Sequence, residues 1–435
     1  MTAVYYTLGV LIFVIALLIS VALHECGHMI PAKRFGVRVS QFFVGFGKTV
    51  WSKTKGETEY GFKAIPLGGY VKLIGMLPPD PKTGEVRESS TGIFSGLIEA
   101  SREAEWEQVK PEDEGRLFYQ LVWWKRVIVM AGGPFVNILI AFLIFAGIFA
   151  TYGNPADRKE SLVLSYVAGC VVPAAEDGRQ CQPDDQIAPA KAAGLEKGDR
   201  LLTVDGEKIT SWTMLTDHIR DNANDKITLT YERDGQVHTT TTNTTVAARP
   251  DLNDPSKTVQ VGFLGVSPTI GPPVTGGPIY TLGVMGDLAT QSAQALLKLP
   301  VSVYRVGLAI VGVEKRDPNG PVSIVGGGRI AGETASAEGF PVKEKALSLL
   351  MLIAGFNFFI GILNLVPLPP LDGGRIAGAL YEAVRRGLAR LFGRPDPGYW
   401  DEAKIMPLVY GIAATLMIMG VVLIVGDLVV PISTT

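Results

Sequence analysis

Histidine and cysteine are both scarce in this chain of 435 residues, which has 4 histidines and 3 cysteines. Three cysteines are too few for a scaffold held together by several disulfides. The formal net charge is −2, so the composition lacks the basic excess typical of nucleic-acid binding, and no nucleic-acid partner is expected. No basic residue precedes the first apolar run, which argues against a cleaved signal peptide and favours a retained transmembrane helix.

Apolar residues, in contrast, make up 47% of the chain and raise its mean hydropathy to +0.26, although 19% of the residues are charged. They are concentrated in four segments long enough to span a bilayer, at about 4–30, 127–152, 346–371 and 403–430. A fifth candidate, 283–313, is interrupted by Asp287, Lys298, Pro300 and Arg305 and is expected to form amphipathic surface helices. The sequence therefore predicts a multi-pass α-helical membrane protein with four transmembrane helices.

Lysine and arginine gather in the loops before the second and the fourth segment, which places both loops in the cytoplasm. The long insert between the second and third segments is then outside. It contains Cys170 and Cys181, which could form a disulfide there or remain two free thiols.

The only formally charged residue between Met1 and Ala32 is Glu25, in the run His24-Glu25-Cys26-Gly27-His28. On a helix this spacing places two imidazoles one turn apart on one face, as zinc binding requires, and the intervening glutamate can deprotonate a metal-bound water. Alternatively, the histidines could be ordinary polar residues of a helix bundle. The run holds half of the histidines in the chain, which favours the metal site.

A catalytic zinc usually has three protein ligands, so a third is needed. The third apolar segment ends in a proline-rich run followed directly by Asp372-Gly373-Gly374. Asp372 can supply an oxygen ligand, or it can simply be a turn aspartate before two glycines. For the histidines and Asp372 to meet at one depth, the first and third segments must cross the membrane in the same direction, which requires that 283–313 does not span.

The insert contains a run, 190–206, that resembles a PDZ domain of the bacterial type, in the pattern A-x-x-A-G-L-x-x-G-D-x-[IL]-x-x-[IV]-D-G. A helix is expected at 212–222 and a strand at 226–233, and 177–188 looks like an insertion relative to this pattern. PDZ domains bind peptide strands at a sheet edge, although this one could instead bind nothing and only restrict access.

The paired motifs resemble those of the site-2 protease family of intramembrane zinc metalloproteases, bacterial PDZ-containing type. Further stretches that match are 44–47, 64–72, 131–137 and 320–324. The resemblance implies that His24, His28 and Asp372 hold one Zn²⁺ per chain and that Glu25 is the general base. It also implies that Asn364 binds substrate, unless it only forms an interhelical hydrogen bond. Gly45-Phe46-Gly47 would form a close-approach loop for substrate in a membrane-associated β region, unless this region is an ordinary cytoplasmic hairpin.

The expected boundaries are 1–31 for the first transmembrane helix, 32–125 for a cytoplasmic loop with a β region at 37–77, 126–153 for the second helix, 160–268 for an extracytoplasmic PDZ domain, 269–343 for surface amphipathic helices and a linker, 344–372 for the third helix, 373–402 for a cytoplasmic amphipathic loop, and 403–431 for the fourth helix.

The function implied is hydrolysis of single-pass membrane proteins, such as anti-sigma factors or remnant signal peptides, in the bacterial plasma membrane. A catalytically silent PDZ scaffold is the alternative. The lipid bilayer and a peptide ligand of the PDZ domain are the other expected partners.

Overall fold

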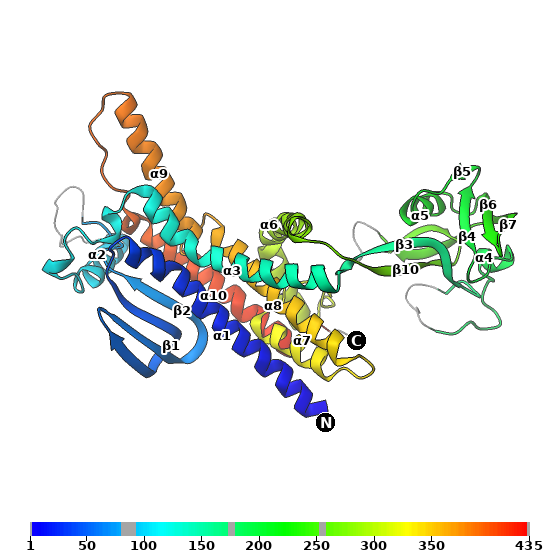
Figure 1. The fold of residues 1–435 in the computed structure, drawn as a ribbon, viewed down its shortest axis with the longest axis horizontal. Helices are drawn as coiled ribbons and strands as arrows, with labels where there is room; N and C mark the ends of the chain where they lie inside the picture. The colour runs from blue at the N-terminus through cyan, green and yellow to red at the C-terminus, as the bar shows by residue number, and fades with distance from the viewer. Residues whose placement is uncertain (1, 80–92, 173–178, 252–257, 433–435) are drawn as a thin grey trace. The chain divides into compact units, whose positions relative to one another are not determined.

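The computed structural model describes residues 2–79, 93–172, 179–251 and 258–432 (Figure 1). The chain forms two compact units. The first, which we call the membrane unit, comprises Met1–Gly147 and Pro278–Thr435, and the second, the inserted unit, comprises Ile148–Gly277.

Five helices among the described residues are long and apolar enough to cross a membrane. In order they are α1 (Thr2–Arg34), α3 (Trp123–Thr151), α6 (Pro278–Ile310), α8 (Val342–Leu365) and α10 (Met406–Val429), the last entered through the short helix η4 (Glu402–Ile405). Four of them coincide with the four predicted segments. Many side chains of α1 that point away from the protein are large and apolar, among them Leu8, Ile15 and Ile19, as expected for a helix in contact with lipid.

Helix α6 differs from the sequence-based expectation because it is one continuous helix of 33 residues rather than several short ones. It has the lowest hydropathy of the five candidates. Figure 1 shows α6 close to end-on, whereas α1, α3 and α8 are seen from the side, so α6 lies across these three helices. Helix α6 is therefore long and apolar enough to cross a membrane, but it does not run parallel to α1, α3 and α8.

Helix α7 (Ile324–Ser336) lies in the range expected to hold surface helices, and yet one face of it is buried. That face consists of small residues, Gly326, Gly327, Gly328, Ala331 and Gly332. They let α7 approach α1 so closely that a methyl group on Gly9 of α1 would overlap the carbonyl of Ala331. Close approach through small residues is the usual way in which helices pack in membranes. The sequence predicted surface helices in this range, whereas α7 packs its glycine-rich face against α1.

The predicted β region is present as two long antiparallel strands, β1 (Val39–Lys55) and β2 (Thr58–Leu73). The ribbon curls on itself, because residues 41–44 of β1 pair with 59–62 on one side and with 69–72 on the other. Gly45 and Gly47 take φ values of +94° and +85° at the bend, a conformation that favours glycine. The curl leaves 69–72 as a sheet edge, since no strand of the described residues pairs with its outer side.

After the β region, the cytoplasmic loop expected at 32–125 continues with helices. Residues 80–92 lie outside the described residues, and the remainder forms α2 (Ile93–Trp106) and the short helix η1 (Pro111–Asp113), with η2 (Phe118–Gln120) following. Ion pairs tie this stretch to the rest of the membrane unit: Arg38 binds the buried carboxylate of Asp113 at 2.7 and 2.8 Å, and Arg102 binds that of Asp401 at 2.5 Å.

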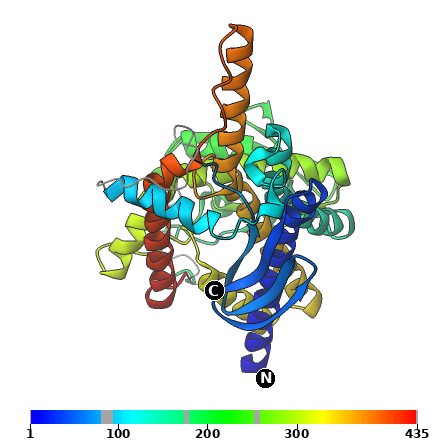
Figure 2. The same cartoon turned by 90° about the vertical axis from the view of Figure 1, so that its left-hand side faces the viewer.

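Helix α8 ends at Leu365, six residues before the predicted end, because the prolines that follow cannot continue a helix. After a turn, α9 (Asp372–Leu391) begins at Asp372. Both glycines that follow Asp372 are in close backbone contact: a methyl group on Gly373 would overlap the carbonyls of Leu365 and Val366, and one on Gly374 would lie 2.6 Å from the backbone nitrogen of Pro369. The glycines thus hold the first turn of α9 against the end of α8. Figure 2 shows the rest of α9 projecting away from the other helices of its unit.

The inserted unit is a small α/β structure with five strands in the order β10-β3-β4-β6-β7 and the short β5 beside β4. The strands are β3 (Asn154–Val167), β4 (Arg200–Val204), β5 (Glu207–Lys208), β6 (Lys226–Arg233), β7 (Gln236–Asn243) and β10 (Val266–Val274); β8 (Thr245–Pro250) and β9 (Thr258–Phe263) form a separate pair, and the helices are α4 (Pro189–Ala192) and α5 (Trp212–Asp221). Leu164, Leu195, Leu201, Leu215 and Leu229 form the centre of its core. The helix expected at 212–222 and the strand expected at 226–233 are both present.

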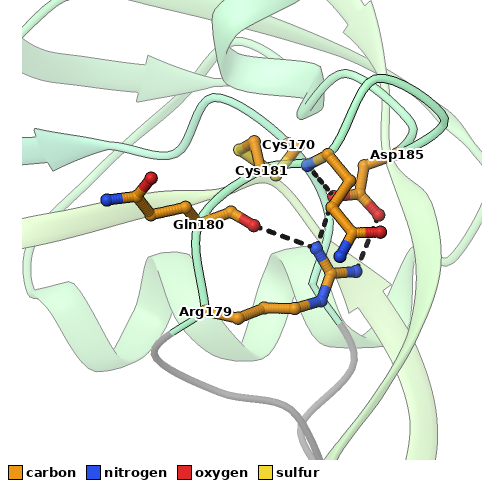
Figure 3. Close-up of a disulfide and its surroundings, with 6 residues drawn as sticks. Cys170, Arg179, Gln180, Cys181 and Asp185 are labelled. Carbon is orange, nitrogen blue, oxygen red and sulfur yellow. Dashed lines mark hydrogen bonds and ion pairs between the residues drawn. A yellow bond between two sulfur atoms is a disulfide. The ribbon is translucent and has the colours of Figure 1, made fainter.

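Figure 3 shows that Cys170 and Cys181 form a disulfide, which settles the alternative left open by the sequence. Beside it, Arg179 binds both carboxylate oxygens of Asp185 at 2.6 and 2.7 Å, and the backbone N–H of Gln182 donates to the same carboxylate. The hydrogen bonds from Arg179 and Gln182 lower the pKa of Asp185 to about 2.

Candidate metal centre

The two histidines of the H-E-x-x-H run lie on the same face of α1, one turn apart, with their Nε2 atoms separated by 3.2 Å. His28 is held by a hydrogen bond of 2.8 Å between its Nδ1 and the carbonyl oxygen of Val129 in α3. Because a carbonyl only accepts, Nδ1 carries the proton and Nε2 keeps a free lone pair, which is the tautomer that a metal ligand needs.

Asp372 reaches the same point from the first turn of α9. Its Oδ2 lies 3.5 Å from Nε2 of His24 and 3.3 Å from Nε2 of His28. Ligand atoms of these three residues all lie within 4.8 Å of one another. The three side chains, from opposite ends of the chain, therefore converge on one point.

The spacing of these atoms fits a zinc ion. Zinc ligands stand about 2.0–2.1 Å from the metal in a tetrahedral arrangement, which places neighbouring ligand atoms about 3.3 Å apart. The separations of 3.2, 3.3 and 3.5 Å match that edge length. Three protein ligands leave the fourth position free, which is the arrangement of a catalytic rather than a structural zinc.

Glycines of α3 make room for the site. A methyl group on Gly27 would overlap the carbonyl of Gly132 and the reverse is also true, so the backbones of α1 and α3 are in contact next to the histidines. A methyl group on Gly133 would overlap Nε2 of His28 and lie 2.7 Å from Nε2 of His24. Only glycine at position 133 leaves the ligand atoms of both rings uncovered.

The cluster opens into a cavity of about 420 Å³ in the membrane unit. Glu25 lines this cavity, and its carboxylate accepts a hydrogen bond from the backbone N–H of Val71 at the free edge of β2. The other lining residues include Ser20, Gly68, Gly69, Tyr70, Asn137, Ile324, Asn364 and Arg375. The three side chains of the cluster, the carboxylate of Glu25 and the edge of β2 thus face one cavity.

The predicted substrate residues are placed differently from one another. Asn364 lines the cavity, whereas Gly45, Phe46 and Gly47 are not among its lining residues. Phe46 instead packs beside the strand edge: a methyl group on Gly68 would be 2.8 Å from its ring, and the ring stacks on Tyr70. Residues 68–71, which line the cavity at this edge, were not singled out within the β region, because their contact with α1 depends on how the ribbon curls. Cys26 is a free thiol outside the cluster.

Comparison with known proteins agrees with this geometry. Residues 12–392 match peptidase family M50. The chain belongs to peptidase family M50. This is the site-2 protease family, so the family resemblance drawn from the motifs is confirmed.

Known proteins align with this M50 peptidase over nearly its whole length. It is 33% identical to the zinc metalloprotease Rip1 of Mycolicibacterium smegmatis, over 98% of this chain and 99% of that protein. It is 31% identical to Rip1 of Mycobacterium tuberculosis, over 98% of both chains. Metalloprotease MmpA of Caulobacter vibrioides is 28% identical over 87% of this chain and 88% of its own. The protein is therefore a zinc metalloprotease, and its apolar helices make it a membrane protein.

Proposed function

We propose that this M50 peptidase cleaves single-pass membrane proteins within the bilayer, with His24, His28 and Asp372 as the zinc ligands. The observation that carries the proposal is the convergence of their three ligand atoms at the separations of a tetrahedral zinc site. When bound, zinc supplies Lewis-acid activation of water and of the scissile carbonyl. A silent scaffold would not need this ligand set, and this makes the scaffold alternative the weaker one.

Glu25 is proposed as the general base. Its carboxylate lines the cavity beside the three ligands, so it can take a proton from the attacking water and deliver it to the nitrogen of the leaving amine. The hydrogen bond from Val71 fixes the orientation of the carboxylate. Glu25 and His28 are buried, and burial strengthens these electrostatic interactions.

The substrate is proposed to bind as an extended strand along residues 68–71 of β2. A helical substrate hides its amides in internal hydrogen bonds and must unwind before a peptide carbonyl can be attacked. Apart from the N–H of Val71, which donates to Glu25, the edge of β2 offers backbone groups to such a strand, as in β-strand addition. Asn364 faces the same cavity, and its amide would hydrogen-bond the substrate backbone or the developing oxyanion. Phe46, with Gly45 and Gly47 at the bend, would support this edge.

Four helices are proposed to span, with α6 on the membrane surface. Since α6 lies across α1, α3 and α8, it does not share their direction. If α6 also crossed, the start of α9 would emerge in the leaflet opposite to the histidines, in conflict with their convergence on Asp372. The β1–β2 ribbon exposes Phe46, Val50, Trp51, Phe62 and Ile65, which suits a hairpin that dips into lipid from the cytoplasmic side.

The inserted unit is proposed to be a PDZ domain outside the plasma membrane of a bacterium. Its motif 190–206, its sheet with the flanking helix α5 and its disulfide support this assignment, because disulfides persist in oxidising compartments. There it would bind a substrate peptide or exclude untrimmed substrates by size. Anti-sigma-factor-like proteins and remnant signal peptides are the proposed substrate classes.

The variant Glu25→Gln tests the proposal in the full-length enzyme reconstituted with zinc. The metal ligands are untouched, so the variant should retain one zinc per chain while cleavage of a single-pass reporter falls by at least about a hundredfold, the lower end of the range for general acid–base catalysis. Mass spectrometry of metal content and gel analysis of the reporter give the two readings. Cleavage at the wild-type rate would exclude Glu25 as the base.

A further inference from the structure

Two asparagines are buried to the same extent in the membrane unit but differ in their partners. Asn357 of α8 is 2% exposed, and both ends of its amide are used: Oδ1 accepts from the hydroxyl of Ser20 in α1, and Nδ2 donates to the carbonyl of Ile353 at 2.9 Å. Asn137 of α3 is also 2% exposed, but its buried Oδ1 has no hydrogen-bond partner within the described residues. Asn357 therefore joins two helices, whereas Asn137 does not.

A buried hydrogen-bond acceptor without a partner needs an explanation. A buried polar atom without a partner loses its hydration and gains nothing in return, so such atoms are few in native proteins and often have a functional role. Asn137 lines the active-site cavity. Its amide is thus available to a molecule that enters this cavity rather than to another helix.

The position of Asn137 relates it to both the metal centre and Asn364. It follows Gly133, which contacts the two imidazoles, by four residues and so lies on the same face of α3, roughly 6 Å further along the helix. A methyl group on Gly361 of α8 would lie 3.4 Å from the Cβ of Asn137. Asn364 comes three residues after Gly361 on the same helix. Because α8 runs in the direction opposite to α3, Asn364 lies back toward the level of Gly133 and the metal ligands, whereas Asn137 lies about one helical turn beyond that level on the same cavity.

We propose that Asn137 is a second substrate-binding residue, whose amide pairs with the backbone of the unwound substrate about two residues from the scissile bond, given a rise of roughly 3.3 Å per residue in an extended strand. Oδ1 accepts a peptide N–H and Nδ2 donates to a peptide carbonyl. An unwound segment exposes backbone groups that its helix had satisfied, so each pairing with the enzyme favours the unwound state. This inference rests on the proposed function.

The test compares Asn137→Leu with Asn357→Leu in the full-length zinc enzyme, reconstituted in lipid nanodiscs with a single-pass substrate. Leucine has a similar volume and cannot form hydrogen bonds. Asn137→Leu should lower kcat/KM about tenfold, as expected for the loss of one or two neutral hydrogen bonds, while its melting temperature stays the same or rises and its zinc content is unchanged. The matched control, Asn357→Leu, should lower the melting temperature, because it breaks hydrogen bonds that are present in the free enzyme.

A second readout identifies the contact itself. Substrates in which one backbone amide is replaced by an ester lack a single N–H, and in the wild type an ester about two residues from the scissile bond should lower kcat/KM several-fold. In Asn137→Leu the same ester should have no further effect.

Three results would overturn the inference: wild-type kcat/KM in Asn137→Leu, a melting temperature lowered as in Asn357→Leu, or ester effects that persist unchanged in Asn137→Leu. If wild-type cleavage did not depend on Glu25, the proposed function would be rejected, and the inference with it. Glu25-dependent cleavage with an indifferent Asn137 would reject the inference alone.

Discussion

Two poorly exposed aspartates, Asp199 of the inserted unit and Asp372 of the membrane unit, are used in opposite ways. The side chain of Asp199 is 1% exposed, and both of its oxygens have partners: Arg233 donates to them at 2.6 and 2.8 Å, and the backbone N–H of Glu196 donates at 2.8 Å. Asp372 is 15% exposed and faces the ring nitrogens of two histidines, with no lysine or arginine paired to it in the described part of the chain.

The difference shows how to distinguish a structural carboxylate from a metal ligand. The charge of Asp199 is neutralised by a guanidinium with matching geometry, so nothing more is required at that site. A carboxylate between two neutral imidazoles lacks a compensating positive charge, which a divalent cation would supply. In the inserted unit, Asp199 joins the turn at 194–199 to β6 through Arg233. In the membrane unit, Asp372 lies where it can complete the proposed zinc site.

Replacing each aspartate by asparagine should give the largest difference between the two sites, in zinc content and in cleavage. Asp372→Asn removes a proposed zinc ligand, so zinc content should fall below one per chain, and cleavage should fall by more than about a hundredfold, which is the upper end of the loss caused by removing an outer-shell partner. Asp199→Asn should retain zinc. Metal analysis and reporter cleavage on the same preparations measure both. Full zinc occupancy in Asp372→Asn would remove the distinction.

Substitution of Gly133 tests whether zinc binding needs the space that this glycine leaves beside the two imidazole rings. Gly133→Ala puts a methyl group against Nε2 of both histidines, and we expect zinc affinity to fall by about 10–100-fold, as for other disturbances next to ligands. Gly147→Ala, in the same helix with no atom within 4 Å of the added methyl, is the matched control and should bind zinc normally. Competition with a chelator measures the affinity. Equal affinities would mean that the two rings move apart at little cost.

Loss of Asp199 should act on stability instead. Asp199→Asn breaks a pair in which Arg233 is 29% exposed, and we expect the inserted unit to lose about 1–3 kcal/mol, less than for a fully buried pair because solvent screens the arginine. Hydrogen exchange at the core strands β4 and β6 in the full-length protein measures this loss. Asp217→Asn, on the exposed face of α5, is the control and should change protection little. Unchanged protection in Asp199→Asn would contradict the structural role.

The smallest expected effect is a dependence of the stability of the inserted unit on pH. Burial alone would raise the pKa of Asp199, but the guanidinium of Arg233 and the N–H of Glu196 hold this pKa below its ordinary value of 3.8. Because the folded state lowers the pKa, the stabilisation is fully present above the ordinary value and is lost as the pH falls through the folded-state pKa. Exchange protection of the wild type should therefore decline below about pH 4 more steeply than that of Asp199→Asn. Parallel declines would show that Asp199 is not the group responsible.

The sequence predicted the parts of the site that a motif states directly. His24, Glu25 and His28 follow from helical spacing, and Asp372 follows from the broken helix before it. Four apolar segments followed from length and hydropathy. The roles of Gly133 and Asn137 could not be predicted, because they depend on how closely α3 approaches α1 and α8, and a glycine or an asparagine in an apolar helix has many uses. The free edge at 68–71 depends on the curl of β1 and β2, which the alternation of residues does not specify.

The most direct test of the central claim is X-ray absorption spectroscopy at the zinc edge on the full-length enzyme. The account predicts two imidazole nitrogens and carboxylate oxygen at about 2.0–2.2 Å, with no sulfur in the coordination shell. In Asp372→Asn the signal should weaken with the zinc content while the imidazole contribution of the remaining ion persists. A sulfur ligand at about 2.3 Å, or a wild-type spectrum that is unchanged in Asp372→Asn at full occupancy, would contradict the assignment of His24, His28 and Asp372 as the zinc site.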